Sequence, residues 1–246
     1  MAETFGKPFL TAEWRYLAML NYEIEPAILR PLVPEGTELD EWNGKIFVSN
    51  VGFLFLNTEV MGLSIPFHQD FEEINLRFYV RRKAEDGWRR GVVFVKEIVP
   101  RAAIALTARW LYNENYVALP TGHVILPSDQ NAENIESAKY FWTFRDKAQF
   151  IELVTRGESA PFSEGAEEEF IAQHFWGYSS QRDGGTIEYR VDHPPWRIWQ
   201  VDSCRLECDV ENLYGKPFTS FLKVKPSSAF LADGSPITVY KGKRIT

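Results

Sequence analysis

The chain has 246 residues, of which 45% are hydrophobic and 25% are charged, a composition that excludes a disordered or fibrous protein. Its 27 basic and 34 acidic residues leave a formal net charge of −7, which argues against general nucleic-acid binding. The uncharged apolar stretch 46–58 is too short to cross a bilayer and the N-terminus has no signal-peptide pattern, so we expect a soluble, cytoplasmic protein without a membrane partner.

Aromatic residues make up 15% of the chain, and large rings favour strands. In chain order the patterns predict a helix at Glu25–Arg30, strands at Lys45–Glu59, Phe71–Lys83 and Arg89–Val99, a helix at Arg101–Tyr112, strands at Tyr116–Leu126, Ile135–Arg145 and Phe150–Arg156, a helix at Glu164–Trp176, and strands at Thr186–Val191, Trp196–Cys208, Phe218–Val224 and Pro236–Lys241. Gly52, within the first strand, indicates a bend or a close approach. We expect one domain over residues 1–246, mainly β (α+β), with an antiparallel sheet and a few short helices.

The clearest predicted element is a β-hairpin of Phe71–Lys83 and Arg89–Val99 around the turn Ala84–Gly87. Its first strand alternates between two rows of side chains, because successive residues of a strand point to opposite faces. The apolar row is Ile74, Leu76, Phe78 and Val80, and the polar row is Glu73, Asn75, Arg77 and Tyr79.

The polar row has two interpretations. In an open antiparallel sheet it faces solvent. In a closed sheet it lines the interior, where a carboxylate and a guanidinium are costly unless they are hydrogen-bonded, so the row marks either a structural network or a ligand site. Arg77 suits a carboxylate ligand because its guanidinium donates two parallel hydrogen bonds. Lys96 and Glu97 on the partner strand point to opposite faces, so only one of them can join the row.

Nothing in the sequence indicates a metal or a cofactor. The four histidines, His68, His123, His174 and His193, stand singly, and His174 falls on the apolar stripe of the helix predicted at Glu164–Trp176. Cys204 and Cys208 lie roughly 13 Å apart if their segment is a strand, which is too far for one zinc ion or one disulfide. Glycine-rich phosphate loops, nucleophile elbows and His-Glu-x-x-His motifs are absent.

The stretch Asp192–Trp196 (DHPPW) contains two prolines directly before an aromatic-rich strand. We interpret it as a rigid turn packed by Trp196 and Trp199, since prolines most often punctuate structure. His193 as an acid–base residue is the alternative.

These motifs together resemble a known family. The segments similar to it are FEEINLRFYV (71–80), GVVFVKEIVPR (91–101), Ala105–Tyr112, DHPPW (192–196) and NLYG (212–215). They resemble the YqjF-type family of uncharacterised conserved proteins, which is grouped with the acetoacetate-decarboxylase-like superfamily. Tyr22–Asp40 and Ala103–Pro120 are similar to acetoacetate decarboxylase itself. The resemblance implies a large, mostly antiparallel β barrel or cone around a ligand cavity.

The resemblance does not extend to the decarboxylase's reaction. That enzyme forms a Schiff base through the first of two adjacent lysines, and an ungapped comparison places Asn115 and Tyr116 there. An amide and a phenol cannot form an imine, so the nucleophile is missing. Glu23 falls where the decarboxylase has an arginine, and Glu73 falls where it keeps a cavity glutamate. Of the lysine, the arginine and the glutamate of the decarboxylase, only the glutamate is retained in this chain.

Three functions follow as hypotheses. The first is a small-molecule-binding protein that acts as an enzyme on a small carboxylate or carbonyl compound, the second is a non-catalytic binding or sensor module, and the third is a protein-interaction subunit whose interior is filled. For the first two we predict Glu73 as an acid or base, with Arg77, Tyr79, Asn115 and Tyr116 at the wall of the ligand cavity. The ligand is expected to be anionic or to contain a carbonyl group, and the oligomeric state, including a homo-oligomer, stays open.

Overall fold

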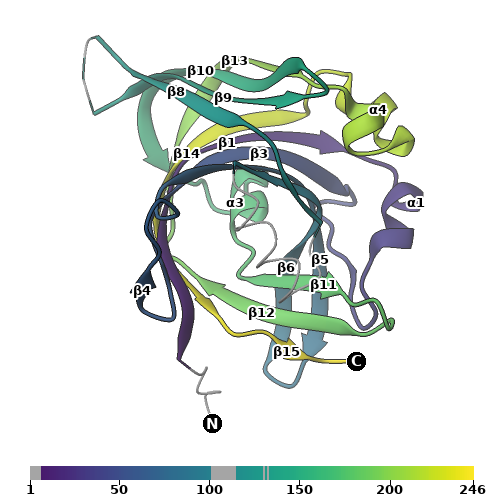
Figure 1. Cartoon of the computed structure of the whole chain (residues 1–246). Helices are drawn as coiled ribbons and strands as arrows, with labels where there is room; N and C mark the ends of the chain where they lie inside the picture. Colours follow the sequence, from purple (N-terminus) through teal and green to yellow (C-terminus); the bar gives the residue numbers. More distant parts are fainter. Residues whose placement is uncertain (1–6, 101–114, 130, 132) are drawn as a thin grey trace.

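The structure is a computed structural model that describes residues 7–100, 115–129, 131 and 133–246. Most of these residues lie in strands of one sheet, and the central part of the sheet closes into a ring (Figure 1). The strands of the ring are β1 (Pro8–Glu23), β3 (Phe47–Val60), β5 (Phe71–Ala84), β6 (Gly87–Val99), β11 (Trp176–Ser180), β12 (Thr186–Asp192) and β14 (Ser228–Tyr240). They pair in the order β12-β11-β6-β5-β3-β1-β14, and a further pairing of β14 with β12 completes the ring.

A second layer covers the outside of the ring. From β14 the sheet continues through β13 (Arg197–Glu207), β10 (Lys147–Pro161), β9 (Ile135–Phe144) and β8 (Thr121–Pro127). These strands fold back over β1 and β3, so the sheet is ring-like but not a regular barrel (Figure 1). The short strands β2 (Glu38–Leu39), β4 (Leu63–Ser64), β7 (Tyr116–Ala118) and β15 (Lys243–Arg244) pair at its margins.

The helices of the described residues are short: α1 (Pro26–Leu29), η1 (Arg30–Leu32), α3 (Glu167–Ala172), α4 (Val210–Leu213), η2 (Lys216–Phe218) and α5 (Thr219–Leu222). The α3 helix lies inside the ring (Figure 1), where Phe170 packs against Phe47 and Tyr79 of the strands. The α4 and α5 helices lie outside it, and their Leu213 and Leu222 are buried in the outer core. None of the helices that the structure describes is long and apolar enough to cross a membrane.

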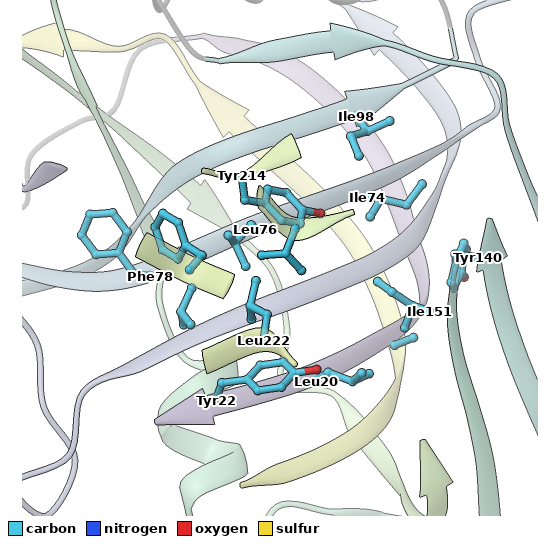
Figure 2. Close-up of a cluster of buried hydrophobic side chains, with 14 of the residues drawn as sticks. Leu20, Tyr22, Ile74, Leu76, Phe78, Ile98, Tyr140, Ile151, Tyr214 and Leu222 are labelled. Atoms are coloured by element: carbon cyan, nitrogen blue, oxygen red, sulfur yellow. The ribbon is translucent and has the colours of Figure 1, made fainter. Parts of the chain in front are cut away.

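The two rows of β5 point into different surroundings. The apolar row lies on the outer face, in a core that also contains Tyr140 of β9, Ile151 of β10, Tyr214 at the end of α4 and Leu222 of α5 (Figure 2). The polar row lies on the inner face, where Tyr79 belongs to a second core with Phe47 and Phe170. Both rows are buried, because the second layer covers one face and the ring encloses the other.

At Gly52 of β3 the second layer lies close against the ring. A Cβ atom at this position would lie 2.8 Å from ring atoms of Tyr140, whose hydroxyl donates a hydrogen bond to the carbonyl oxygen of Tyr16 (2.8 Å). The close approach predicted from the sequence is confirmed, and it explains why this position takes no side chain.

The mainly β architecture and the central hairpin are confirmed. β5 and β6 are antiparallel and are joined by a two-residue loop at 85–86. The predicted strand Tyr116–Leu126 is divided into β7 and β8 by Leu119 and Pro120. The helix predicted at Arg101–Tyr112 lies outside the described residues. The single domain over residues 1–246 stays a prediction.

Three predictions are wrong. The segment Phe218–Val224 is helical, because Phe218 and Leu222 pack one turn apart into the outer core instead of alternating. Of the segment Glu164–Trp176, which was predicted to be one helix, only Glu167–Ala172 is helical (α3). Trp176, at the end of the predicted helix, is the first residue of β11. No strand was expected at β1, where Tyr16 has a positive φ of 53° and interrupts the alternation with a register shift.

Candidate functional site

The inner face of the ring encloses a cavity of about 270 Å³. Its wall is formed mostly by aromatic and aliphatic side chains, among them Trp14, Phe55, Phe71, Phe94, Tyr189 and Trp196. The polar side chains in the wall are Thr58, His68, Glu73, Arg77, Glu97, Tyr116, His174 and His193. A mostly apolar cavity with a few polar groups is the usual form of a small-molecule site.

Two carboxylates and one guanidinium of this wall come from the hairpin. Glu73 and Arg77 lie on the inner face of β5 and are 3% and 7% exposed. Glu97 of β6 lies opposite Asn75, which places it on the same face and diagonal to Glu73. Lys96 lies opposite Leu76, on the outer face, so Glu97 is the one that joins the polar row.

Glu73 is set up as a proton donor or acceptor. Its Oε1 accepts a hydrogen bond from Nδ2 of Asn75 (3.0 Å), and Oε2 accepts one from the hydroxyl of Tyr116 (3.4 Å). Burial raises the pKa of Glu73 to about 7, although both hydrogen bonds and the nearby charge of Arg77 act to lower it. The carboxyl group is therefore divided between its two protonation states near neutral pH.

Arg77 has few partners of its own. Its Nε is buried without a hydrogen-bond partner, and its Nη2 lies 3.9 Å from the sulfur of Met19. Its Cζ lies 5.8 Å from the ring centroid of Tyr79. Among the described residues no carboxylate forms an ion pair with Arg77, in contrast to Arg89, which pairs with Glu188 at 2.7 Å. The guanidinium is thus a buried cation with unused donor capacity.

The structure separates the other residues that the sequence placed at the site. Tyr116 lines the cavity. Tyr79 is buried behind it, and its hydroxyl is within 2.6 Å of Oγ of Ser49. Asn115 is exposed, its Nδ2 donates to the carbonyl oxygen of Val95 (2.9 Å), and it is not among the described residues that line the cavity.

A buried histidine–aspartate pair at the cavity was not foreseen from the sequence. Nε2 of His174, just after α3, lies 3.2 Å from Oδ2 of Asp40, and Arg90 donates to the same oxygen at 2.6 Å. Burial lowers the pKa of His174 to about 4, although the contact with Asp40 opposes this, so the imidazole is neutral at pH 7. The two residues are 134 positions apart in the chain, and no local pattern links them.

The turn at Asp192–Trp196 packs partly as expected. Trp196 is buried, donates to Oγ of Ser235 (2.9 Å) and stacks on His193 with centroids 4.3 Å apart. Trp199 belongs to the outer core instead, so its share in packing the turn is wrong. His193 lines the cavity, and burial lowers its pKa.

The lysines of the chain all lie among the described residues, and none of them lines the cavity. Both cysteines have free thiols. Within the described part of the chain, no group of three or more histidine, cysteine, aspartate or glutamate side chains could hold a metal ion.

Solved structures with low sequence identity share this fold. The acetoacetate decarboxylase of Legionella pneumophila matches with a TM-score of 0.66 at 13% identity, over 99% of this chain and 90% of that chain. The enduracididine biosynthesis enzyme MppR in complex with pyruvate matches with 0.66 at 10% identity, over 100% and 93%. An acetoacetate decarboxylase-like enzyme from Sphingomonas wittichii RW1 matches with 0.65 at 12%, over 98% and 94%. The chain therefore has the acetoacetate-decarboxylase-like fold.

The sequence places the chain more closely. The model of the family DUF2071, described as an uncharacterized conserved protein, matches residues 11–236, and the chain belongs to this family. The uncharacterized protein YqjF of Bacillus subtilis (strain 168) is 26% identical over 195 residues, which are 77% of this chain and 75% of that protein. The family resemblance expected from the sequence is confirmed.

Proposed function

We propose that this protein binds a small carboxylate or carbonyl compound in the cavity and acts on it as an enzyme, with Arg77 as the anion-binding group and Glu73 as acid or base. The observation that supports this most directly is Arg77 itself, a buried cation without an ion-pair partner among the described residues. A buried charge without an ion pair is destabilising, which supports an anion as the group that completes the site.

The size and chemistry of the wall restrict that anion. A volume of about 270 Å³ lies just below the range typical of drug-sized ligands, which favours a small compound. Aromatic walls reduce the local dielectric and strengthen the interaction of the guanidinium with a carboxylate. In a relative of the same fold, MppR, a structure contains pyruvate, which is a compound of this class.

Glu73 supports an acid–base reaction. With a pKa of about 7 it can give or take a proton at neutral pH, and the hydroxyl of Tyr116 stabilises its charged form. An imine mechanism is excluded from the proposal because none of the lysines lines the cavity and Lys96 lies on the outer face.

The anion-binding role is tested by titration calorimetry with a panel of small carboxylates, pyruvate first, and with acetone as the uncharged control. We expect pyruvate to bind and acetone to bind far more weakly. Arg77→Met should weaken carboxylate binding by about 2–5 kcal/mol, and Arg77→Lys should retain part of it. A loss below about 1 kcal/mol in Arg77→Met would show that the guanidinium does not hold the anion.

The absence of an imine is tested by borohydride reduction in the presence of acetoacetate, followed by intact-mass measurement. We expect an unchanged mass. A stable adduct on any lysine, with Lys96 as the first candidate, would mean that the nucleophile has moved elsewhere in the chain.

The second candidate function is a binding or sensor module that uses the same cavity without turnover. The missing Schiff-base lysine favours it, and incubation with each bound carboxylate followed by product analysis separates it from the enzyme. The burial of Glu73 and Arg77 at the cavity wall, where Arg77 has no ion-pair partner among the described residues, counts against a protein-interaction subunit with a filled interior.

A further inference from the structure

Two buried polar atoms at the cavity have unused hydrogen-bonding capacity of opposite kinds. Nδ1 of His174 has no hydrogen-bond partner among the described residues, and neither does Nε of Arg77. The arginine nitrogen is always a donor. The role of the histidine nitrogen depends on which tautomer is present.

The tautomer of His174 follows from Asp40. The carboxylate of Asp40 also receives a hydrogen bond from Arg90 and can only accept, so Nε2 of His174 is the protonated nitrogen that donates to it. The imidazole is neutral at pH 7, since burial holds its pKa near 4. Nδ1 is therefore a bare acceptor, and Asp40 acts as the residue that positions it.

The two atoms belong to side chains that both lie near the ring of Tyr79. The ring of Tyr79 lies 4.6 Å from the ring of His174, between centroids, and 5.8 Å from Cζ of Arg77. The charge of Arg77 also contributes to lowering the pKa of His174. Both side chains line the same cavity, and the side chain of His174 is 1% exposed. Among the residues that the structure describes, the wall of the cavity thus contains both an unpaired donor and an unpaired acceptor.

We propose that the ligand of the cavity is a small hydroxy carboxylic acid, whose hydroxyl oxygen accepts a hydrogen bond from Nε of Arg77 and whose hydroxyl proton is donated to Nδ1 of His174. The proposal rests on the proposed function, since it assumes that Arg77 also binds the carboxylate in this cavity.

Other polar groups satisfy only one of the two atoms. An oxo group can accept from Arg77 but has no proton for His174, so the histidine acceptor would stay buried and unpaired. An ammonium group can donate to His174 but is repelled by the guanidinium and cannot accept from it. A hydroxyl group both donates and accepts, and water is the one competitor with the same property.

The test compares matched acids that differ at one carbon. Propionate, pyruvate and the two enantiomers of lactate share a carboxylate and a three-carbon skeleton, and butanoate with its 2-oxo and 2-hydroxy forms extends the set by one carbon. Titration calorimetry should show one hydroxy enantiomer binding about 10- to 100-fold more tightly than the parent acid and the oxo acid. Equal affinities of the three forms in both sets would overturn the proposal, because bound water would then serve the two atoms equally well.

Two substitutions at His174 separate ligand recognition from structure. His174→Gln keeps a polar atom near the position of Nε2, beside Asp40, but removes the acceptor at Nδ1. The ratio of the affinities for the hydroxy acid and propionate should therefore fall to about one. His174→Asn places an amide oxygen near the position of Nδ1 and loses the contact with Asp40. It should keep most of the preference and lose thermal stability instead. A preference that survives in His174→Gln would assign the hydroxyl to another residue.

The same experiment distinguishes failure of this proposal from failure of the proposed function. If the acids bind through Arg77 but without a preference for the hydroxy form, only the hydroxyl subsite is wrong. If no carboxylate of either set binds, and Arg77→Met changes nothing, the anion site itself is wrong and the hydroxyl subsite fails with it.

Discussion

The inner and outer faces of β5 are equally buried and chemically opposite. The outer row, Ile74, Leu76, Phe78 and Val80, has 0% exposed surface and packs against the second layer and the helices. The inner row, Glu73, Asn75, Arg77 and Tyr79, is at most 7% exposed. Of these residues, Glu73 and Arg77 line the cavity. Burial alone therefore does not distinguish the residues that only stabilise the fold from those beside the cavity. The polarity of the buried residues distinguishes them.

The inner face is not arranged for maximum stability. Oδ1 of Asn75 and Nε of Arg77 are buried without hydrogen-bond partners among the described residues. Each such atom is costly, and folded proteins keep few of them. Unsatisfied groups that persist beside a cavity are expected where a ligand completes the site. The outer face consists mostly of aliphatic and aromatic side chains and closes tightly around Gly52. It also contains buried polar atoms without partners in the described part of the chain, Oδ1 of Asn50 and Nε1 of Trp142, but these do not line the cavity.

The largest expected effect is on the outer face. Phe78→Ala should lower the free energy of unfolding by about 3–5 kcal/mol, since it leaves a cavity between β5 and the helices. Chemical denaturation followed by fluorescence measures it. Arg77→Met, one residue away, should leave stability unchanged or raise it, because an apolar side chain replaces an unpaired buried charge. A similar loss in both variants would mean that the two faces serve the same structural purpose.

The same denaturation experiment bears on domain organisation. If residues 1–246 form one domain, Phe78→Ala should shift a single cooperative transition without changing its denaturant dependence. A second transition that the substitution leaves in place would contradict the single-domain prediction.

The next largest effect concerns pH and lies on the inner face. Glu73 has a folded pKa of about 7 against 4.5 for the free side chain, so the folded state binds its proton more tightly. Its contribution to stability is complete below pH 4.5 and is lost as the pH rises to 7, by up to about 3 kcal/mol. Glu73→Gln removes this loss, so its stability relative to the wild type should increase between pH 4.5 and 7.

His174 has the opposite pH dependence. Its folded pKa of about 4 lies below the usual 6.5, so its contribution is complete above pH 6.5 and is lost as the pH falls to 4. Between pH 4.5 and 6.5 the opposite changes in stability from Glu73 and His174 nearly cancel in the wild type. Single variants are therefore needed to measure each contribution. His174→Gln should lose stability relative to the wild type as the pH rises through this window. Parallel profiles for Glu73→Gln, His174→Gln and the wild type would show that neither group is buried as described.

The sequence was sufficient for one half of this comparison. The alternation of Phe71–Lys83 defined the two rows and left two interpretations of the polar row, of which the structure shows the inward-facing one. Local patterns failed where a long-range contact decides. Phe218 and Leu222 became helical only because the outer face of the ring offers them a place to pack. His174 and Asp40 come together only when the ring closes, and the sequence around either residue contains no pattern that predicts the pair.

The smallest expected effect separates two adjacent residues that the sequence placed together. Asn115→Ala should change carboxylate affinity by less than about 0.5 kcal/mol, because the Asn115 side chain is exposed and bonds to the backbone of Val95 outside the cavity.

Tyr116→Phe is the matched control, since it removes the hydroxyl that donates to Glu73. That hydrogen bond lowers the pKa of Glu73, so its loss should raise the pKa further and move any pH-dependent activity to higher pH. Titration of both variants with the same carboxylate measures the difference. An effect of Asn115→Ala as large as that of Tyr116→Phe would place Asn115 at the cavity after all. The boundary between the exposed edge and the inner wall would then lie one residue earlier in the chain.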